Sequence, residues 1–195
     1  GVKYMSVEDL RGTMKDILSK SRYLHVISTE EVSVDLALIH GYDVQKASIA
    51  GVLHDCAKYL SNAELIEECK KYNLPITEAE EKSSQLLHAK VGAAYAEHIY
   101  NITDKEILTA ITYHTTGRPN MTLLEKITFT ADYIEPNRKI LPRIDEVRKA
   151  AYDNLDYAIY LILENTLDYL KVTNTVMDDK TEMTYEYYKG IIKTI

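Results

Sequence analysis

The sequence predicts an all-α protein folded as a helical bundle, and three observations support this fold class. Apolar residues recur every three to four positions along almost the whole chain, which is the spacing of one face of a helix. No segment shows the alternation of apolar and polar residues that is typical of a half-buried strand. A Ser or Thr followed three positions later by Glu, the pattern of a capping box that begins a helix, recurs at Ser61, Thr77, Thr103 and Thr122.

The first two predicted helices come before Gly41. Ser6, with an acidic residue three positions later, begins a helix that carries apolar residues from Val7 to Leu18. The second helix covers about residues 22–40 and is expected to end at Gly41, because glycine readily adopts the left-handed conformation that closes a helix.

A third helix is predicted over about residues 44–59, with Asp43 as a favourable N-cap. This segment is apolar nearly all round, so we expect it to lie in the middle of the bundle.

The later part of the chain is predicted to alternate helices and two loops. Helices are expected over residues 87–100 and 155–170, and the irregular loops over 115–120 and 136–142. The segment 174–195 is rich in Tyr, Thr and Met, and its sequence gives no clear packing pattern.

The charge and composition exclude several classes of function. A net charge of −7 argues against broad binding of DNA or RNA, because such binding depends on a basic surface. A small anionic substrate is still compatible, since a metal ion and a few cations reverse the field inside one pocket. No apolar run reaches the length of a membrane span, and Cys56 and Cys69 are expected to be buried thiols. The sequence therefore predicts a cytoplasmic protein that binds neither nucleic acid nor membrane.

One group of ionisable residues predicts a metal site. His54 and Asp55 are adjacent on the most apolar predicted helix, where two such groups are costly without a partner. A divalent cation compensates both, and imidazole with carboxylate suits iron, manganese or zinc. His25 lies on the preceding helix and Asp132 on a later helix that is equally apolar, so these four residues are the predicted ligands.

The order of these residues, a histidine, a His-Asp pair and a distant aspartate, resembles the HD superfamily. His88 and His114 lie between the pair and the last aspartate, and they resemble the additional histidines with which some HD proteins hold a second metal ion. In that resemblance Asp55 bridges the two ions. His40 and His98 do not fit the pattern and are interpreted as structural residues.

Two bridged metal ions predict phosphate chemistry, because such a pair activates a water that attacks phosphorus. Lys58 follows Asp55 by three residues, so helical spacing would place both on one face. Asp55 and Lys58 are therefore the expected catalytic residues. The expected substrate contacts, chosen because they lie close to the ligands in the sequence, are Arg22, Lys58, Thr115, Gly117, Arg118 and Arg138.

Four longer runs resemble the YqeK-type bacterial HD-domain bis(5′-nucleosyl)-tetraphosphatases. They are GVLHDCAK at 51–58, LHAKVGA at 87–93, YHTTGR at 113–118 and ADYIEPNR at 131–138. The resemblance implies symmetrical hydrolysis of diadenosine tetraphosphate to two ADP at a dinuclear iron centre, although manganese or another first-row metal suits the same ligands. The same resemblance implies six metal ligands, which are His25, His54, Asp55, His88, His114 and Asp132.

We expect one all-helical HD domain over residues 1–195. Its metal core is expected at about 22–143, the range that the resemblance spans, and the helical pattern predicts C-terminal helices at about 145–195. A homodimer is compatible with the sequence. Two other functions stay open: a phosphatase of mono- or dinucleotides that uses the same metal centre, and a nucleotide sensor without turnover.

Overall fold

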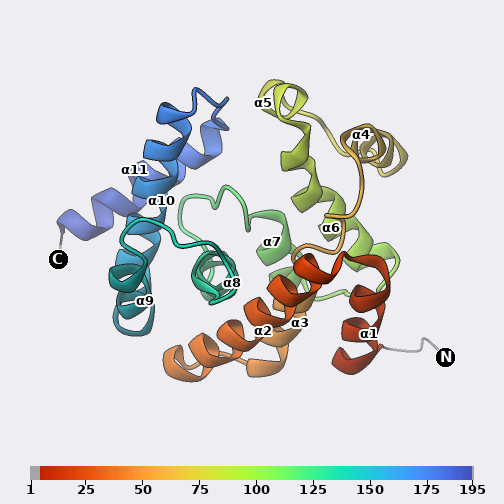
Figure 1. Cartoon of the computed structure of the whole chain (residues 1–195), viewed down its shortest axis with the longest axis horizontal. Helices are drawn as coiled ribbons and strands as arrows, with labels where there is room; N and C mark the ends of the chain where they lie inside the picture. Colours follow the sequence, from red (N-terminus) through yellow and green to blue (C-terminus); the bar gives the residue numbers. More distant parts are fainter. Residues whose placement is uncertain (1–4, 195) are drawn as a thin grey trace.

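The computed structural model describes residues 5–194, and the secondary structure in this range is helical throughout (Figure 1). The predicted all-α fold class is therefore confirmed. In chain order the α-helices and the short 3₁₀ helix η1 are α1 Val7–Ile17, α2 Lys20–His40, α3 Val44–Leu53, α4 Asn62–Lys71, α5 Glu78–Lys82, η1 Ser84–Leu86, α6 Leu87–His98, α7 Lys105–Thr112, α8 Leu123–Ile134, α9 Ile144–Asp153, α10 Leu155–Val172 and α11 Asp179–Lys193.

Most of the predicted caps form, and they begin α1, α3, α4, α5 and α8. Gly41 closes α2 with a left-handed φ of 73°. The capping box predicted at Thr103 is wrong, because the N-cap of α7 is Asp104, whose carboxylate accepts a hydrogen bond from the backbone N–H of Glu106. That carboxylate also pairs with Lys46 at 2.8 Å. Capping boxes form at Ser6, Ser61, Thr77 and Thr122.

The centre of the fold is made by α2, α3 and α8, with α2 packed against both of the others. Leu36 of α2, Leu53 of α3 and Ile127 of α8 are fully buried, and burial of each such side chain stabilises the fold by about 1.5–3 kcal/mol. The two helices α2 and α3 approach closely at Gly51, where a Cβ atom would lie 2.8 Å from the Cα of Glu30. Only a residue without a side chain lets α2 and α3 pack this closely.

The C-terminal helices form a wall beside this centre. Figure 1 shows α10 and α11 on one side of α8 and the α4–α6 region on the other. The long helix α10 packs against α8, α9 and α11. Tyr188 of α11 is fully buried, and its hydroxyl accepts a hydrogen bond of 3.0 Å from the backbone N–H of Met121. This contact attaches α11 to the loop between α7 and α8.

The third predicted helix is shorter than expected, since α3 ends at Leu53 and not near residue 59. Beyond it the backbone N–H groups of Cys56, Lys58 and Leu60 bond to carbonyls three residues back, which makes a series of tight turns. The ring of His54 takes the carbonyl of Gly51 as its partner at 2.7 Å. Side-chain bonding of this kind competes with helix continuation.

Among residues 5–194, no helix combines the length and the hydropathy that a membrane span requires. Cys56 and Cys69 are buried free thiols, as predicted. The Cys56 sulfur donates to the carbonyl of Gly92 at 3.3 Å.

We predict that Gly51→Ala lowers the free energy of unfolding by about 1–3 kcal/mol, since the new methyl group collides with the backbone of α2. The measurement is urea-induced unfolding followed by circular dichroism. Gly12→Ala is the matched control, because nothing lies within 4 Å of a Cβ at that helical position. The control is expected to raise the free energy of unfolding by about 0.5–1 kcal/mol. Equal effects of the two changes would contradict this account of the α2–α3 contact.

Candidate metal centre

The six residues predicted as metal ligands come from different elements and lie close together. His25 lies on α2, His54 and Asp55 directly follow α3, and Asp132 lies near the end of α8. His88 is the second residue of α6, and His114 lies in the turn after α7. Asp132 is partly buried, and the other five residues are buried.

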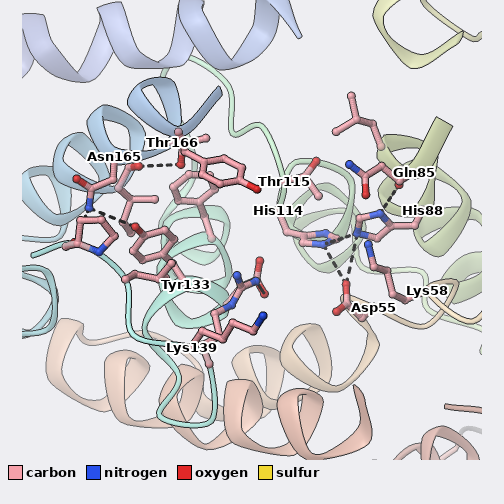
Figure 2. A pocket seen from close by; sticks show the side chains of 18 of the residues that line it. Asp55, Lys58, Gln85, His88, His114, Thr115, Tyr133, Lys139, Asn165 and Thr166 are labelled. Atoms are coloured by element: carbon pink, nitrogen blue, oxygen red, sulfur yellow. Dashed lines mark hydrogen bonds and ion pairs between the residues drawn. The ribbon is translucent and has the colours of Figure 1, made fainter. Parts of the chain in front are cut away.

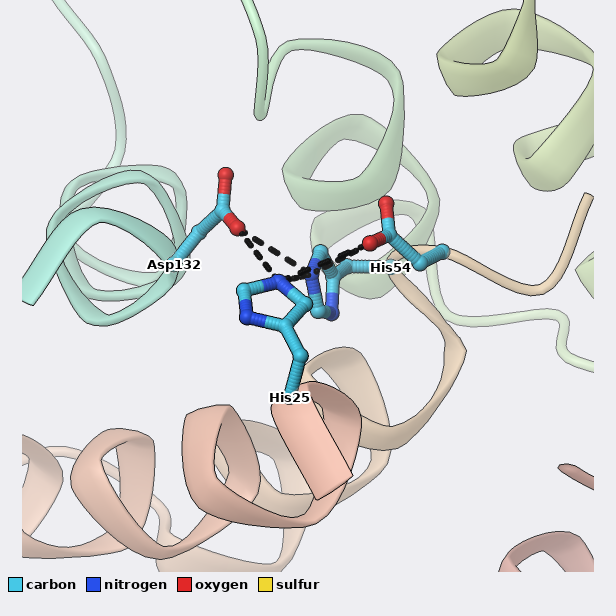
Figure 3. Close-up of side chains that lie close together, drawn as sticks. His25, His54 and Asp132 are labelled. Atoms are coloured by element: carbon cyan, nitrogen blue, oxygen red, sulfur yellow. Dashed lines mark hydrogen bonds and ion pairs between the residues drawn. The ribbon is translucent and has the colours of Figure 1, made fainter. Parts of the chain in front are cut away.

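The first group of donor atoms comes from His25, His54, Asp55 and Asp132, all within 4.8 Å of one another. Figure 3 shows the two imidazoles and the Asp132 carboxylate facing one another. Oδ1 of Asp132 lies 2.9 Å from Nε2 of His25 and 3.3 Å from Nε2 of His54. Oδ2 of Asp55 lies 3.5 Å and 3.4 Å from the same two nitrogens.

The second group comes from Asp55, His88 and His114 (Figure 2). It uses the other oxygen of Asp55, since Oδ1 lies 3.4 Å from Nε2 of His88 and 3.3 Å from Nε2 of His114. The two ring nitrogens are 3.2 Å apart. Asp55 therefore takes part in both groups, with one carboxylate oxygen turned toward each.

Three of the histidines have their orientation fixed in the same way. Nδ1 of His54, His88 and His114 lies 2.7, 2.5 and 2.7 Å from the backbone carbonyl three residues earlier. A carbonyl oxygen only accepts hydrogen bonds, so Nδ1 carries the hydrogen in each ring. Nε2 then points its lone pair at the centre, which is the form of imidazole that binds a metal.

The convergence of these donors favours a cation bound between them. In the second group, the lone pairs of two imidazoles meet an oxygen of Asp55, with no hydrogen between them when the rings are neutral. Burial opposes a charge on His54, yet the facing carboxylates raise the pKa of its ring to about 10. Burial also opposes charge on Asp55 and Asp132, yet the facing histidines hold the pKa of both carboxyls well below the usual range. The donor set fits a divalent metal ion.

His25 is oriented differently, because its Nδ1 faces the side chain of Glu135 and not a backbone carbonyl. Glu135 has no predicted role from the sequence. Nδ1 of His25 lies 3.4 Å from Oε1 of Glu135. Glu135 is fully buried, and this oxygen has no hydrogen-bond partner among the described residues. The other oxygen accepts from the backbone N–H of Asn137 at 3.1 Å. A carboxylate behind a metal-binding histidine fixes the ring and increases its basicity. The sequence signal was a glutamate one helical turn after Asp132.

A cavity of about 910 Å³ opens beside the ligands, and four of the predicted substrate contacts line it: Arg22, Lys58, Thr115 and Arg138. Arg22 donates to Oδ2 of Asp55 and Arg138 to Oδ1 of Asp132, both at 3.0 Å. Burial lowers the pKa of Lys58, although the neighbouring Asp55 opposes this effect. The cavity is therefore cationic at the end where the candidate ligands lie.

Two predicted substrate contacts, Gly117 and Arg118, are not among the residues that line the cavity. Arg118 donates twice to the buried carboxylate of Glu125 and lies 4.4 Å from the centre of the Tyr113 ring. Gly117 has a φ of 65°, and a Cβ there would meet Thr184 of α11 at 2.9 Å. Both residues hold the loop after α7 in place, and contact with substrate stays a prediction for them.

The remaining two histidines lie away from the ligands. Nε2 of His40 bonds the carbonyl of Ala151 at 2.7 Å. His98 is exposed and stacks on the ring of Tyr72. Their structural interpretation fits these contacts.

Known proteins resemble this chain over nearly its whole length. The HD domain model matches residues 22–137, a range that includes every residue of both ligand groups. A symmetrical bis(5′-nucleosyl)-tetraphosphatase of Bacillus subtilis (strain 168) is 37% identical over 94% of this chain and 97% of its own. One of Staphylococcus aureus (strain NCTC 8325 / PS 47) is 39% identical over 94% and 95%. The crystal structure of a predicted HD superfamily hydrolase involved in NAD metabolism, from Clostridium acetobutylicum, superposes with a TM-score of 0.92 at 36% identity, covering 96% of this chain and 99% of that one.

We predict that Glu135→Ala weakens metal binding about 10–100-fold, because His25 loses the carboxylate that lies 3.4 Å behind its ring. Glu135→Gln keeps an amide oxygen that can accept from Nδ1, so it is expected to restore most of the affinity. Titration of the metal-free protein with Mn²⁺, followed by calorimetry, measures both variants. If Glu135→Gln binds as weakly as Glu135→Ala, or if neither differs from the unchanged protein, Glu135 does not position His25.

Proposed function

This chain belongs to the HD domain family, and on that basis we propose that it is a symmetrical bis(5′-nucleosyl)-tetraphosphatase, which hydrolyses diadenosine tetraphosphate to two ADP. The observation that carries the proposal is the pair of donor groups that share Asp55 at the cationic end of a cavity. The relatives named for this reaction match over nearly their whole length, so the resemblance is not limited to the metal motif.

We propose that two divalent cations bind, one in each donor group, with Asp55 as the shared ligand. Iron is the proposed metal, because the sequence resembles an iron-dependent family. Manganese and other first-row ions suit the same imidazole and carboxylate donors. When bound, such a pair supplies an activated water and stabilises negative charge on the phosphoryl oxygens.

The residues of the chain itself position the substrate. Arg22 and Arg138 are held by the carboxylates of Asp55 and Asp132, so their guanidinium groups lie where the polyphosphate would enter. Arginine suits this task because its planar donors match phosphate oxygens. Lys58 lines the same end, and its ammonium group would meet a phosphoryl oxygen close to Asp55. Fixed positive charge at the point where negative charge develops is the main contribution a protein makes to phosphoryl transfer.

A second cavity supports a dinucleoside substrate over a mononucleotide. It has a volume of about 320 Å³ and lies among residues of α5, α6 and the start of α11. Leu86 and Thr115 line both cavities, so the two adjoin close to His88 and His114. Two adjoining cavities would accommodate the two ends of a long substrate. A phosphatase of mono- or dinucleotides with the same metals is the alternative.

Cytoplasmic localisation and a homodimer stay predictions from the sequence. Neither is required for the proposed reaction, because all the residues assigned to it lie in one chain.

We predict that the protein loaded with Fe²⁺ or Mn²⁺ releases ADP as the sole early product from diadenosine tetraphosphate, measured by chromatography. Asp55→Ala is expected to reduce the rate at least 1,000-fold, on the order of the losses seen for central catalytic groups. His98→Ala is the matched control and should leave the rate unchanged, since His98 is exposed and distant from the ligands. AMP together with ATP would contradict symmetrical cleavage. No product from metal-bound protein would contradict the proposal and favour the mononucleotide phosphatase or the sensor.

A further inference from the structure

The large cavity has two chemically different ends. The metal-ligand end carries Asp55, Lys58, His88 and His114, whereas the far end is lined by residues of α8, the loop before α9, and α10. We call the far end the aromatic wall and define it by Phe129, Tyr133, Pro142, Ile162, Tyr169 and Val172. In Figure 2 Tyr133 lies on one side of the cavity, Asp55, Lys58, His88 and His114 lie on the other, and Lys139 lies between them.

Part of the aromatic wall is held rigidly by hydrogen bonds. The side-chain amide of Asn165 donates to the hydroxyl of Tyr133 at 3.2 Å and to the carbonyl of Pro142 at 2.7 Å. These bonds join α8, α10 and the loop between α8 and α9. Burial raises the pKa of Tyr133, although Asn165 opposes this, so its hydroxyl keeps its hydrogen. Because that oxygen accepts from Asn165, the hydrogen is free to be donated into the cavity.

The outer part of the wall leaves apolar surface in contact with water. Tyr169 is 67% exposed and Val172 is 86% exposed, although both line the cavity. Single exposed apolar residues are common, but apolar side chains that rim a cavity mark a place where a ligand binds.

The order of groups along the cavity matches the order of groups in a nucleotide. Lys139 lies between the aromatic wall and the metal-ligand end (Figure 2), and Arg138 lies at the metal-ligand end, where it pairs with Asp132 at 3.0 Å. A nucleotide is flat and largely apolar at its base, and its phosphates extend from one side. A nucleotide whose phosphates lay beside Lys139 and the metal-ligand end would therefore direct its base toward the wall.

We propose that the aromatic wall is the subsite for one nucleoside of the substrate, with its base packed against Tyr133 and Tyr169. This inference rests on the proposed function, and it assigns the nucleoside to α8 and α10 and not to Gly117 and Arg118. Stacking on aromatic rings tolerates any base, so the wall discriminates weakly between adenine and guanine. Its contribution is to favour nucleotides over inorganic polyphosphate.

Calorimetric titration of the Mn²⁺-loaded protein with ADP and with inorganic pyrophosphate tests the subsite. Tyr169→Ala is expected to weaken ADP binding about 10-fold, which equals about 1.4 kcal/mol, because loss of a stacking ring costs this much or more. Pyrophosphate has no base, so its affinity should stay within twofold. Tyr152→Ala is the matched control, since Tyr152 is an exposed tyrosine of α9 that lines neither cavity.

The outcomes separate the subsite from the reaction. Any of three results would overturn the subsite. Tyr169→Ala could bind ADP as tightly as the original protein does, or it could lose affinity for ADP and for pyrophosphate equally. The third result is that the original protein binds pyrophosphate but not ADP. The protein could also bind ADP in a way that depends on Tyr169 and yet release no ADP from diadenosine tetraphosphate. That result would support the subsite and overturn the proposed function.

Discussion

The carboxylate of Asp55 is the constraint on which the rest of the site depends. One of its oxygens faces His25 and His54, and the other faces His88 and His114. Hydrogen bonds to backbone carbonyls turn the lone pairs of three of these rings toward it. Such a concentration of buried acceptors is unfavourable without positive charge. A metal ion bound here would therefore stabilise the folded protein, because the unfolded chain does not bring these donors together.

The same contacts link the packing of the helices to the chemistry. Gly51 lets α3 approach α2, and its carbonyl is the partner that orients His54. Because α3 ends at Leu53, Asp55 leaves the helical path and reaches both donor groups. Glu135, directly after α8, faces Nδ1 of His25. In His54, His88 and His114 the same ring nitrogen faces a backbone carbonyl. Beyond the ligands, α8 and α10 provide a cavity wall with few charges, which suits a nucleoside and not a phosphate.

The sequence predicted the elements that follow from local pattern and the residues that are costly to bury. Capping residues located the starts of α1, α3, α4, α5 and α8. His54, Asp55 and Asp132 were found because their neighbours are apolar, whereas His88 and His114 were found through the resemblance to HD proteins. The end of α3 was not predicted, because the tight turns after it depend on side-chain bonding by His54. Glu135 was not recognised, since its contact with His25 depends on where α8 ends. Tyr133 and Tyr169 look like core residues in the sequence, because periodicity cannot tell a cavity wall from a core. The pairing of Arg118 with Glu125 was not predicted, because the sequence does not show which carboxylate the fold brings to it.

The measurement that tests the central claim most directly is anomalous X-ray scattering from crystals of the Mn²⁺-loaded protein. This account predicts two anomalous peaks about 3.5–4 Å apart, the spacing of a carboxylate-bridged pair. One peak should lie among His25, His54 and Asp132, the other beside His88 and His114, with an oxygen of Asp55 at each. A single peak, or two peaks that do not share Asp55, would contradict the bridging role of this residue.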